Sequence, residues 1–211
     1  QLNSASPEEM RDFISETVVQ QKNKFVIGLG GDHAVTIGLV KGQEQLQEDF
    51  SVLILDAHAD FRDSWNGSNL NHACVTKQLS KKHEVAVVGV RSMDKDEALQ
   101  IVSDENVQIL KAHEFTLEKF KQILPQLKKK VYLSIDVDVF DPSIIRNTGT
   151  PEPGGLYWDQ IIDILRLIFH EKEVIGADVV EFAPQEGDNY SAEAYSLAKL
   201  VYKIMALYQK I

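Results

Sequence analysis

The residues best suited to chemistry are acidic and histidine side chains that follow apolar runs of the sequence. Two of these runs, 51–55 and 131–135, have the composition of buried strands. The residues that follow them at alternate positions are Asp56, His58, Asp60, Asp136 and Asp138. Side chains at alternate positions leave an extended backbone on one side. Four carboxylates in one place repel one another unless cations neutralise them, and their charge matches two divalent ions. The pattern therefore predicts a two-metal centre.

A third segment adds a sixth potential ligand. Gly30-Gly31-Asp32-His33 follows another apolar run, and its glycines permit a tight turn that leaves His33 at the end of a strand. Any one of the three segments alone is more often a turn or a solvated strand end, so the prediction depends on their joint occurrence. Four carboxylates and two imidazoles without a thiolate suit Mn²⁺ best, in five- or six-coordination. Two such ions would activate water near neutral pH, which predicts hydrolysis.

Composition limits the class of protein. The chain has 211 residues, a mass of 23.8 kDa and ordinary hydrophobic and charged fractions of 44% and 26%, which predict one domain over residues 1–211. A net charge of −10 argues against nucleic acid as a partner and mildly favours a small cationic molecule. No apolar run reaches the roughly 20 residues that span a bilayer, so no membrane partner is expected. A single cysteine, Cys74, fits a reducing compartment, and we expect the cytoplasm.

Strand-like and helix-like segments alternate along the whole chain. The expected strands are 25–29, 52–55, 85–90, 107–110, 131–135 and 174–180. The expected helices are 7–21, 35–47, 72–81, 93–104, 116–128, 157–170 and 192–208, the first with Ser6 as N-cap. This alternation predicts a mainly parallel sheet covered by helices on both faces, with ligands beyond the carboxyl ends of the strands. Two polar loops, 60–71 and 141–155, are long enough to be functional.

Five motifs resemble those of the ureohydrolases, the family of arginase and agmatinase. They are Gly30-Gly31-Asp32-His33, Asp56-Ala57-His58-Ala59-Asp60, Ser134-Ile135-Asp136-Val137-Asp138-Val139-Phe140-Asp141-Pro142, Gly154-Gly155-Leu156 and Asp178-Val179-Val180-Glu181-Phe182-Ala183-Pro184. The resemblance covers the chain from about Phe25 to its C-terminus. It implies a three-layer α/β/α sandwich with a mainly parallel sheet, shorter at its N-terminal end than is usual in the family. It also implies two Mn²⁺ per chain and cleavage of a guanidino compound to urea and an amine.

The resemblance also assigns roles to individual residues. One Mn²⁺ would be held by His33, Asp56, Asp60 and Asp136, and the other by His58, Asp56, Asp136 and Asp138. Asp60 is expected among the metal ligands and also among the catalytic residues. Glu181 aligns with the glutamate that receives the guanidinium, a role that suits a carboxylate. His72 aligns with a histidine that transfers protons or positions substrate. Without the family match, both would be read as ordinary polar side chains.

The expected substrate is a small cationic guanidino compound, and agmatine, which would yield putrescine, is the first choice. The segment His72-Ala73-Cys74-Val75 resembles agmatinases. Asp63 would suit a cationic tail, whereas Arg62 would suit a carboxylate, so formimidoylglutamate and guanidino acids such as guanidinobutyrate remain alternatives. Family members usually form trimers or hexamers, which predicts a homo-oligomer.

Two rivals of other classes use the same fold. A zinc-dependent deacetylase would hold one zinc and would lack the Asp56-Ala57-His58-Ala59-Asp60 pattern. A non-catalytic metal-binding module would have less reason to keep all six ligands. Metal content separates the first rival from a two-manganese hydrolase, and urea release separates the second.

Overall fold

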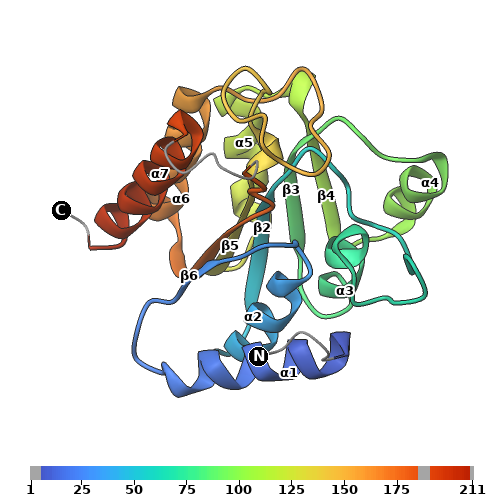
Figure 1. The fold of residues 1–211 in the computed structure, drawn as a ribbon, viewed down its shortest axis with the longest axis vertical. Coiled ribbons are helices and arrows are strands. Elements are labelled where there is room, and N and C mark those ends of the chain that lie inside the picture. Colours follow the sequence, from blue (N-terminus) through green and yellow to red (C-terminus); the bar gives the residue numbers. More distant parts are fainter. Residues whose placement is uncertain (1–5, 185–190, 210–211) are drawn as a thin grey trace.

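A six-stranded parallel sheet forms the centre of the fold (Figure 1). This computed structural model describes residues 6–184 and 191–209. The strands are β1 (Ile27–Leu29), β2 (Phe50–Leu55), β3 (Val85–Val90), β4 (Val107–Lys111), β5 (Lys130–Asp136) and β6 (Glu173–Val180). Their order is β1-β6-β5-β2-β3-β4, and every pairing is parallel. The predicted parallel sheet is thereby confirmed.

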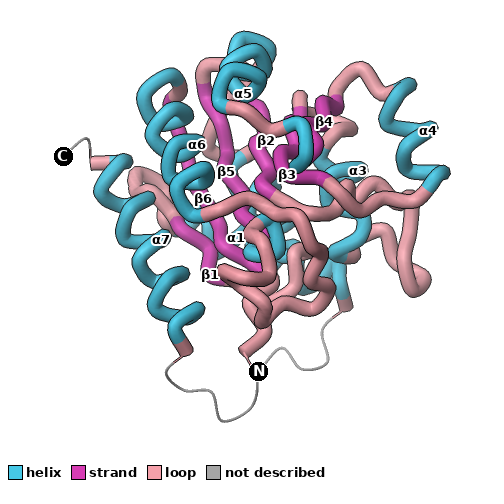
Figure 2. Tube along the Cα trace, turned by 90° about the horizontal axis from the view of Figure 1, so that it is seen from above, coloured by secondary structure: helices cyan, strands magenta, loops and turns pink. Residues whose placement is uncertain are grey.

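Helices flank the sheet on both sides, as Figure 2 shows. The helices are α1 (Pro7–Gln20), α2 (Val35–Gln43), α3 (Val75–Leu79), α4 (Lys95–Ser103), α5 (Leu117–Ile123), α6 (Trp158–Glu171) and α7 (Ala192–Tyr208). Side chains of α1, α2, α3 and α4 belong to one apolar core, and those of α5, α6 and α7 to the other. The two cores give the expected three-layer α/β/α arrangement. Within the described ranges, no helix has both the length and the apolar character needed to cross a bilayer.

The central strands are apolar on both faces because both faces are covered. All six residues of β2 are buried, and its side chains alternate between the cores. Leu53 and Leu55 pack in the core beneath α5 to α7, whereas Val52 and Ile54 pack in the core beneath α1 to α4. Such continuous apolar runs are typical of strands buried on both faces.

The first and last helices begin where the sequence predicts. Ser6 caps α1 in a capping box with Glu9, and Pro7 occupies the first turn. Ser191 caps α7, and its Oγ accepts a hydrogen bond from Ala194 N–H at 3.1 Å. Leu200 and other apolar residues of α7 pack in one core.

Several helix ends differ from the prediction. The segment expected to be helical over 116–128 ends its α-helix at Ile123 and continues as the 3₁₀ turn Leu124–Gln126. Pro125 explains the change, because its ring and missing N–H cannot continue an α-helix. The segment 72–81 begins instead as the 3₁₀ turn His72–Cys74, and the segment 35–47 ends its helix at Gln43.

Candidate metal centre and adjoining pocket

The three predicted ligand segments meet at the carboxyl edge of the sheet, although their strands are not all neighbours. Strands β2 and β5 pair directly, but β6 lies between β5 and β1. His33 reaches the site because the turn after β1 carries it across the end of β6. The parallel sheet thus gathers segments that are far apart in sequence at one edge.

His33 lies among three carboxylates. Its Nδ1 is 3.2 Å from an oxygen of Asp56, 3.1 Å from one of Asp60 and 3.2 Å from one of Asp136. The side chains of His33 and Asp56 are each only 1% exposed. The structure therefore brings together all four residues expected around one ion.

His58 occupies the centre of a second, adjoining group. Its Nδ1 is 2.8 Å from an oxygen of Asp138 and 3.6 Å from one of Asp56. Asp56 belongs to both groups, which agrees with the bridging position implied by the resemblance. Asp136, the other carboxylate expected to bridge, lies in the group of His33, and it accepts a hydrogen bond from the backbone N–H of Asp138 at 2.9 Å.

Backbone turns position these side chains. Asp138 also accepts a hydrogen bond from Ala57 N–H at 2.9 Å, which ties the segment after β5 to the segment after β2. The regular strand ends at Leu55, so the extended geometry that the alternation assumed does not continue to Asp60. Asp60 instead adopts a left-handed backbone conformation with φ +50°. Such a conformation is unusual outside glycine and is often found at functional sites.

Two polar atoms of the candidate metal site are buried without a partner. This site, called the cage below, consists of His33, Asp56, His58, Asp60, Asp136 and Asp138. Among the residues that the structure describes, His33 Nδ1 and Asp56 Oδ2 are buried and make no hydrogen bond of adequate geometry. Buried polar atoms are nearly always satisfied, and leaving one unsatisfied costs about 1–3 kcal/mol. Both atoms face the same small space, together with other carboxylate oxygens. A divalent cation placed among them would satisfy both, so the donor set fits a metal ion.

The electrostatics of the cage also favour cations. Burial lowers the pKa of His58, but the carboxylates of Asp138 and Asp56 outweigh it and raise that pKa to about 11. Burial and the charge of Asp56 raise the pKa of Asp60 to about 7. Burial and neighbouring carboxylates raise the pKa of Asp136 as well. Without metal, the cage therefore holds protons at neutral pH that a divalent ion would displace.

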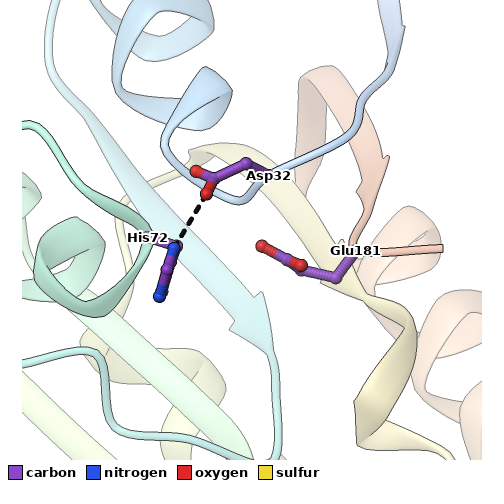
Figure 3. A group of neighbouring side chains, drawn as sticks. All are labelled: Asp32, His72 and Glu181. Carbon is purple, nitrogen blue, oxygen red and sulfur yellow. Dashed lines mark hydrogen bonds and ion pairs between the residues drawn. The ribbon is translucent and has the colours of Figure 1, made fainter. Parts of the chain in front are cut away.

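A second cluster lies beside the cage and contains His72 and Glu181 (Figure 3). His72 Nδ1 is 2.8 Å from an oxygen of Asp32, in the turn after β1. Glu181 follows β6 with a left-handed φ of +65°, and its backbone N–H donates to Gly31 O at 2.7 Å. One oxygen of Glu181 accepts a hydrogen bond from His33 N–H at 2.6 Å. The second cluster is thus connected to the cage through the segment 31–33.

One cavity of about 460 Å³ joins the two clusters. Parts of both long loops line it, which supports the expectation that these loops are functional. Its outer wall includes Arg62, whose guanidinium lies 2.9 Å from Asp94 and 4.5 Å from the centre of the Trp65 ring. Met93 and Glu97 also line this wall. The cavity is thus lined by residues of both carboxylate clusters and by Arg62, which is already paired.

Comparison with known proteins agrees with this geometry. The model of the arginase family matches residues 2–207. The chain belongs to the arginase family. It is 39% identical over 205 residues to the N(1)-aminopropylagmatine ureohydrolase of Thermus thermophilus, covering 95% of this chain and 69% of that protein. It is 36% identical over 182 residues to the agmatinase of Pyrococcus horikoshii, covering 86% and 62%.

A solved structure of the arginase family has the same fold. The crystal structure of the agmatine ureohydrolase of Thermoplasma volcanium superposes with a TM-score of 0.84 at 28% identity, covering 98% of this chain and 71% of that one. Both the family and the fold class expected from the motifs are thereby confirmed. The chain spans about two thirds of the length of these curated arginase-family relatives.

Sequence reasoning missed three residues that support the site. Arg91 donates hydrogen bonds to the carbonyl oxygens of Asp138 at 2.7 Å and Glu152 at 2.8 Å, among others, and so joins the ligand-bearing turn to the 141–155 loop. Asp32 contacts His72, and Asp178 accepts a hydrogen bond from Ser134, whose Oγ lies 3.0 Å from His33 Nε2. Asp32 and Asp178 stand in the quoted motifs, but only the folded structure shows what they contact.

Proposed function

We propose that this chain binds two Mn²⁺ and hydrolyses a guanidino compound to urea and an amine, as a ureohydrolase of the agmatinase type. The observation that carries the proposal is the buried cage with two unsatisfied polar atoms beneath a cavity that also contains Glu181. The two relatives above, an aminopropylagmatine ureohydrolase and an agmatinase, support the same reaction class.

The residues that would hold the ions are those of the cage. His33, Asp56, Asp60 and Asp136 would bind one ion, and His58, Asp138 and the shared carboxylates would bind the other. Four carboxylate charges balance two divalent ions, and the absence of a thiolate among these ligands favours Mn²⁺ over structural zinc. When bound, two such ions supply Lewis acidity that acidifies water and neutralises developing negative charge.

The second cluster supplies groups for the substrate. Glu181 presents a carboxylate to the cavity, and such a group receives a guanidinium by charge-assisted hydrogen bonds. Its backbone and one oxygen are held by Gly31 and His33, so the carboxylate is fixed relative to the cage. His72 lines the same cavity, and Asp32 orients its ring for proton transfer to the departing amine.

The wall of the cavity favours an amine tail over a carboxylate tail. Arg62, the residue that would suit a guanidino acid, is paired with Asp94 and stacked on Trp65. Its charge is therefore balanced before any substrate enters. Glu97 adds another carboxylate on this wall, although its oxygens accept hydrogen bonds from Phe61 and Asp94 N–H groups. Agmatine or an N-substituted agmatine fits this charge distribution.

The test is urea release from four substrates in the presence of Mn²⁺. Agmatine, aminopropylagmatine, arginine and guanidinobutyrate are compared, and formimidoylglutamate is assayed by formamide release. We expect turnover of agmatine or aminopropylagmatine at least tenfold above the acids. Turnover of guanidinobutyrate or formimidoylglutamate alone would contradict the proposed preference for a substrate with an amine tail. No product from any of these compounds would favour a non-catalytic module.

The domain organisation, the oligomeric state and the cellular location of the chain are also proposals. We propose one domain over residues 1–211, a trimeric or hexameric homo-oligomer and a cytoplasmic location. Light scattering after size exclusion gives the oligomer size, and limited proteolysis tests the single domain. Localisation of a tagged protein in its cell of origin tests the compartment.

A further inference from the structure

Asp178 is a fully buried carboxylate that belongs to neither the metal cage nor the pocket. It lies on β6 opposite Ser134 of β5, and it is 0% exposed. Three hydroxyl groups donate to it. Ser134 Oγ donates at 2.7 Å to one oxygen, and the hydroxyls of Tyr132 and Thr36 donate at 2.8 Å and 3.0 Å to the other. Burying a carboxylate is costly, and an apolar side chain would fill the space without that cost.

The hydrogen bond from Ser134 to Asp178 determines what Ser134 can offer to His33. Ser134 Oγ is 3.0 Å from His33 Nε2. A serine hydroxyl has one proton, and here that proton points at Asp178. Its oxygen can therefore only accept from the imidazole, so Nε2 must carry the hydrogen. The other ring nitrogen, Nδ1, is the one that faces the three carboxylates of the cage.

We infer that Asp178, acting through Ser134, is a positioning residue that keeps a proton on His33 Nε2 and leaves Nδ1 as the nitrogen that binds a metal ion. This inference rests on the metal centre proposed above. Imidazole binds a metal through its unprotonated nitrogen, and the partner of the other nitrogen decides which one that is. Tyr132 and Thr36 keep Asp178 in the role of acceptor, because each donates to the carboxylate.

The arrangement depends on the order of the strands. His33 comes from the turn after β1, while Ser134 and Asp178 are directly opposed on β5 and β6. Strand β6, inserted between β5 and β1, therefore brings the carboxylate beneath the histidine. The motif that contains Asp178 also supplies Glu181, so one short segment would serve both the metal ligand and the guanidinium.

The test is Mn²⁺ affinity, measured from the electron paramagnetic resonance signal of free Mn²⁺ during titration. Ser134→Ala removes the acceptor for Nε2–H and should weaken binding about 10- to 100-fold. Ser134→Thr keeps the hydroxyl and should bind within about threefold of the wild type. If the Ser134→Ala variant does not fold, Ser134→Cys takes its place. The cysteine side chain has a similar shape, but its thiol is a poor hydrogen-bond acceptor, so this variant should also bind Mn²⁺ more weakly than the wild type.

A matched control separates this role from general stability. Ser51 is equally buried, lies on the neighbouring strand β2, and makes hydrogen bonds with Glu84 at 3.1 Å and Lys128 N–H at 2.8 Å, away from the cage. Ser51→Ala should lower the melting temperature and leave Mn²⁺ affinity unchanged. Equal affinities for wild type and Ser134→Ala would overturn the inference, as would equal weakening by both alanine variants. A wild type that binds no Mn²⁺ would instead overturn the metal centre itself.

Discussion

Replacing Glu181 with glutamine should remove most of the catalytic efficiency while leaving the metal content unchanged. One Glu181 oxygen already accepts the His33 N–H at 2.6 Å, so the other oxygen carries most of the contact with a guanidinium. Losing one partner of a buried charged pair costs about 2–5 kcal/mol. A single available oxygen places the cost near the lower end, at about 2–3 kcal/mol, which is roughly 30- to 150-fold in kcat/KM. The new amide would also turn its NH₂ group towards the guanidinium, because its oxygen stays with His33.

The assay is urea release over a range of agmatine concentrations, with Mn²⁺ content measured on the same samples. Glu193→Gln is a matched control, because Glu193 also accepts a backbone hydrogen bond, from Asn147 N–H at 3.2 Å, but does not line the cavity. We expect wild-type kinetics for the control and two Mn²⁺ per chain in both variants. Unchanged kinetics in Glu181→Gln would refute the role of this carboxylate, and lost metal would show that it serves the cage instead.

Other substitutions and conditions test the cage. Asp136→Ala should abolish urea release and lower the content of both ions, measured by elemental analysis, and full occupancy would contradict its place as a ligand. Gly89 has φ +107°, and a Cβ there would lie 2.9 Å from Asp56 O. Gly89→Ala should therefore destabilise the protein by more than about 1 kcal/mol in denaturant titration, and an unchanged midpoint would count against this packing. Because the neighbouring carboxylates raise the pKa of His58 to about 11, Mn²⁺ must displace its proton together with other protons of the cage, so apparent affinity should rise at least tenfold per pH unit between pH 6.5 and 8.5. The ion pairs between protonated His58 and the carboxylates stabilise the metal-free fold fully below pH 6.5, and this stabilisation is lost as the pH rises towards 11. An Mn²⁺ affinity that does not change with pH would contradict the assignment of His58 as a ligand.

The positions of the candidate metal ligands could be predicted because each stands next to a strong local signal. Apolar runs mark β2 and β5, and Asp56 and Asp136 come at their carboxyl ends. Parallel strands place such ends at one edge, so fold class predicts that these residues share the carboxyl edge of the sheet. The first helix has an equally clear signal, since Ser6 stands where an N-cap is expected.

The supporting residues could not be predicted from local pattern. In the sequence, Asp178 is a polar residue inside an apolar strand. Only the pairing of β6 with β5 shows that it lies opposite Ser134. Arg91 reads as a charge after a strand, yet its guanidinium donates to carbonyl groups from two distant segments. The left-handed conformation of Asp60 has no sequence signal of its own, because most such positions are glycine. Contacts between distant segments depend on register, which local sequence does not specify.

Anomalous diffraction from crystals grown with Mn²⁺ tests the central claim most directly. Two manganese peaks about 3.5–4 Å apart, on either side of Asp56 and with His33 and His58 as ligands, are the expected result. One tetrahedral ion, or no ion among these six side chains at millimolar Mn²⁺, would contradict the two-metal hydrolase.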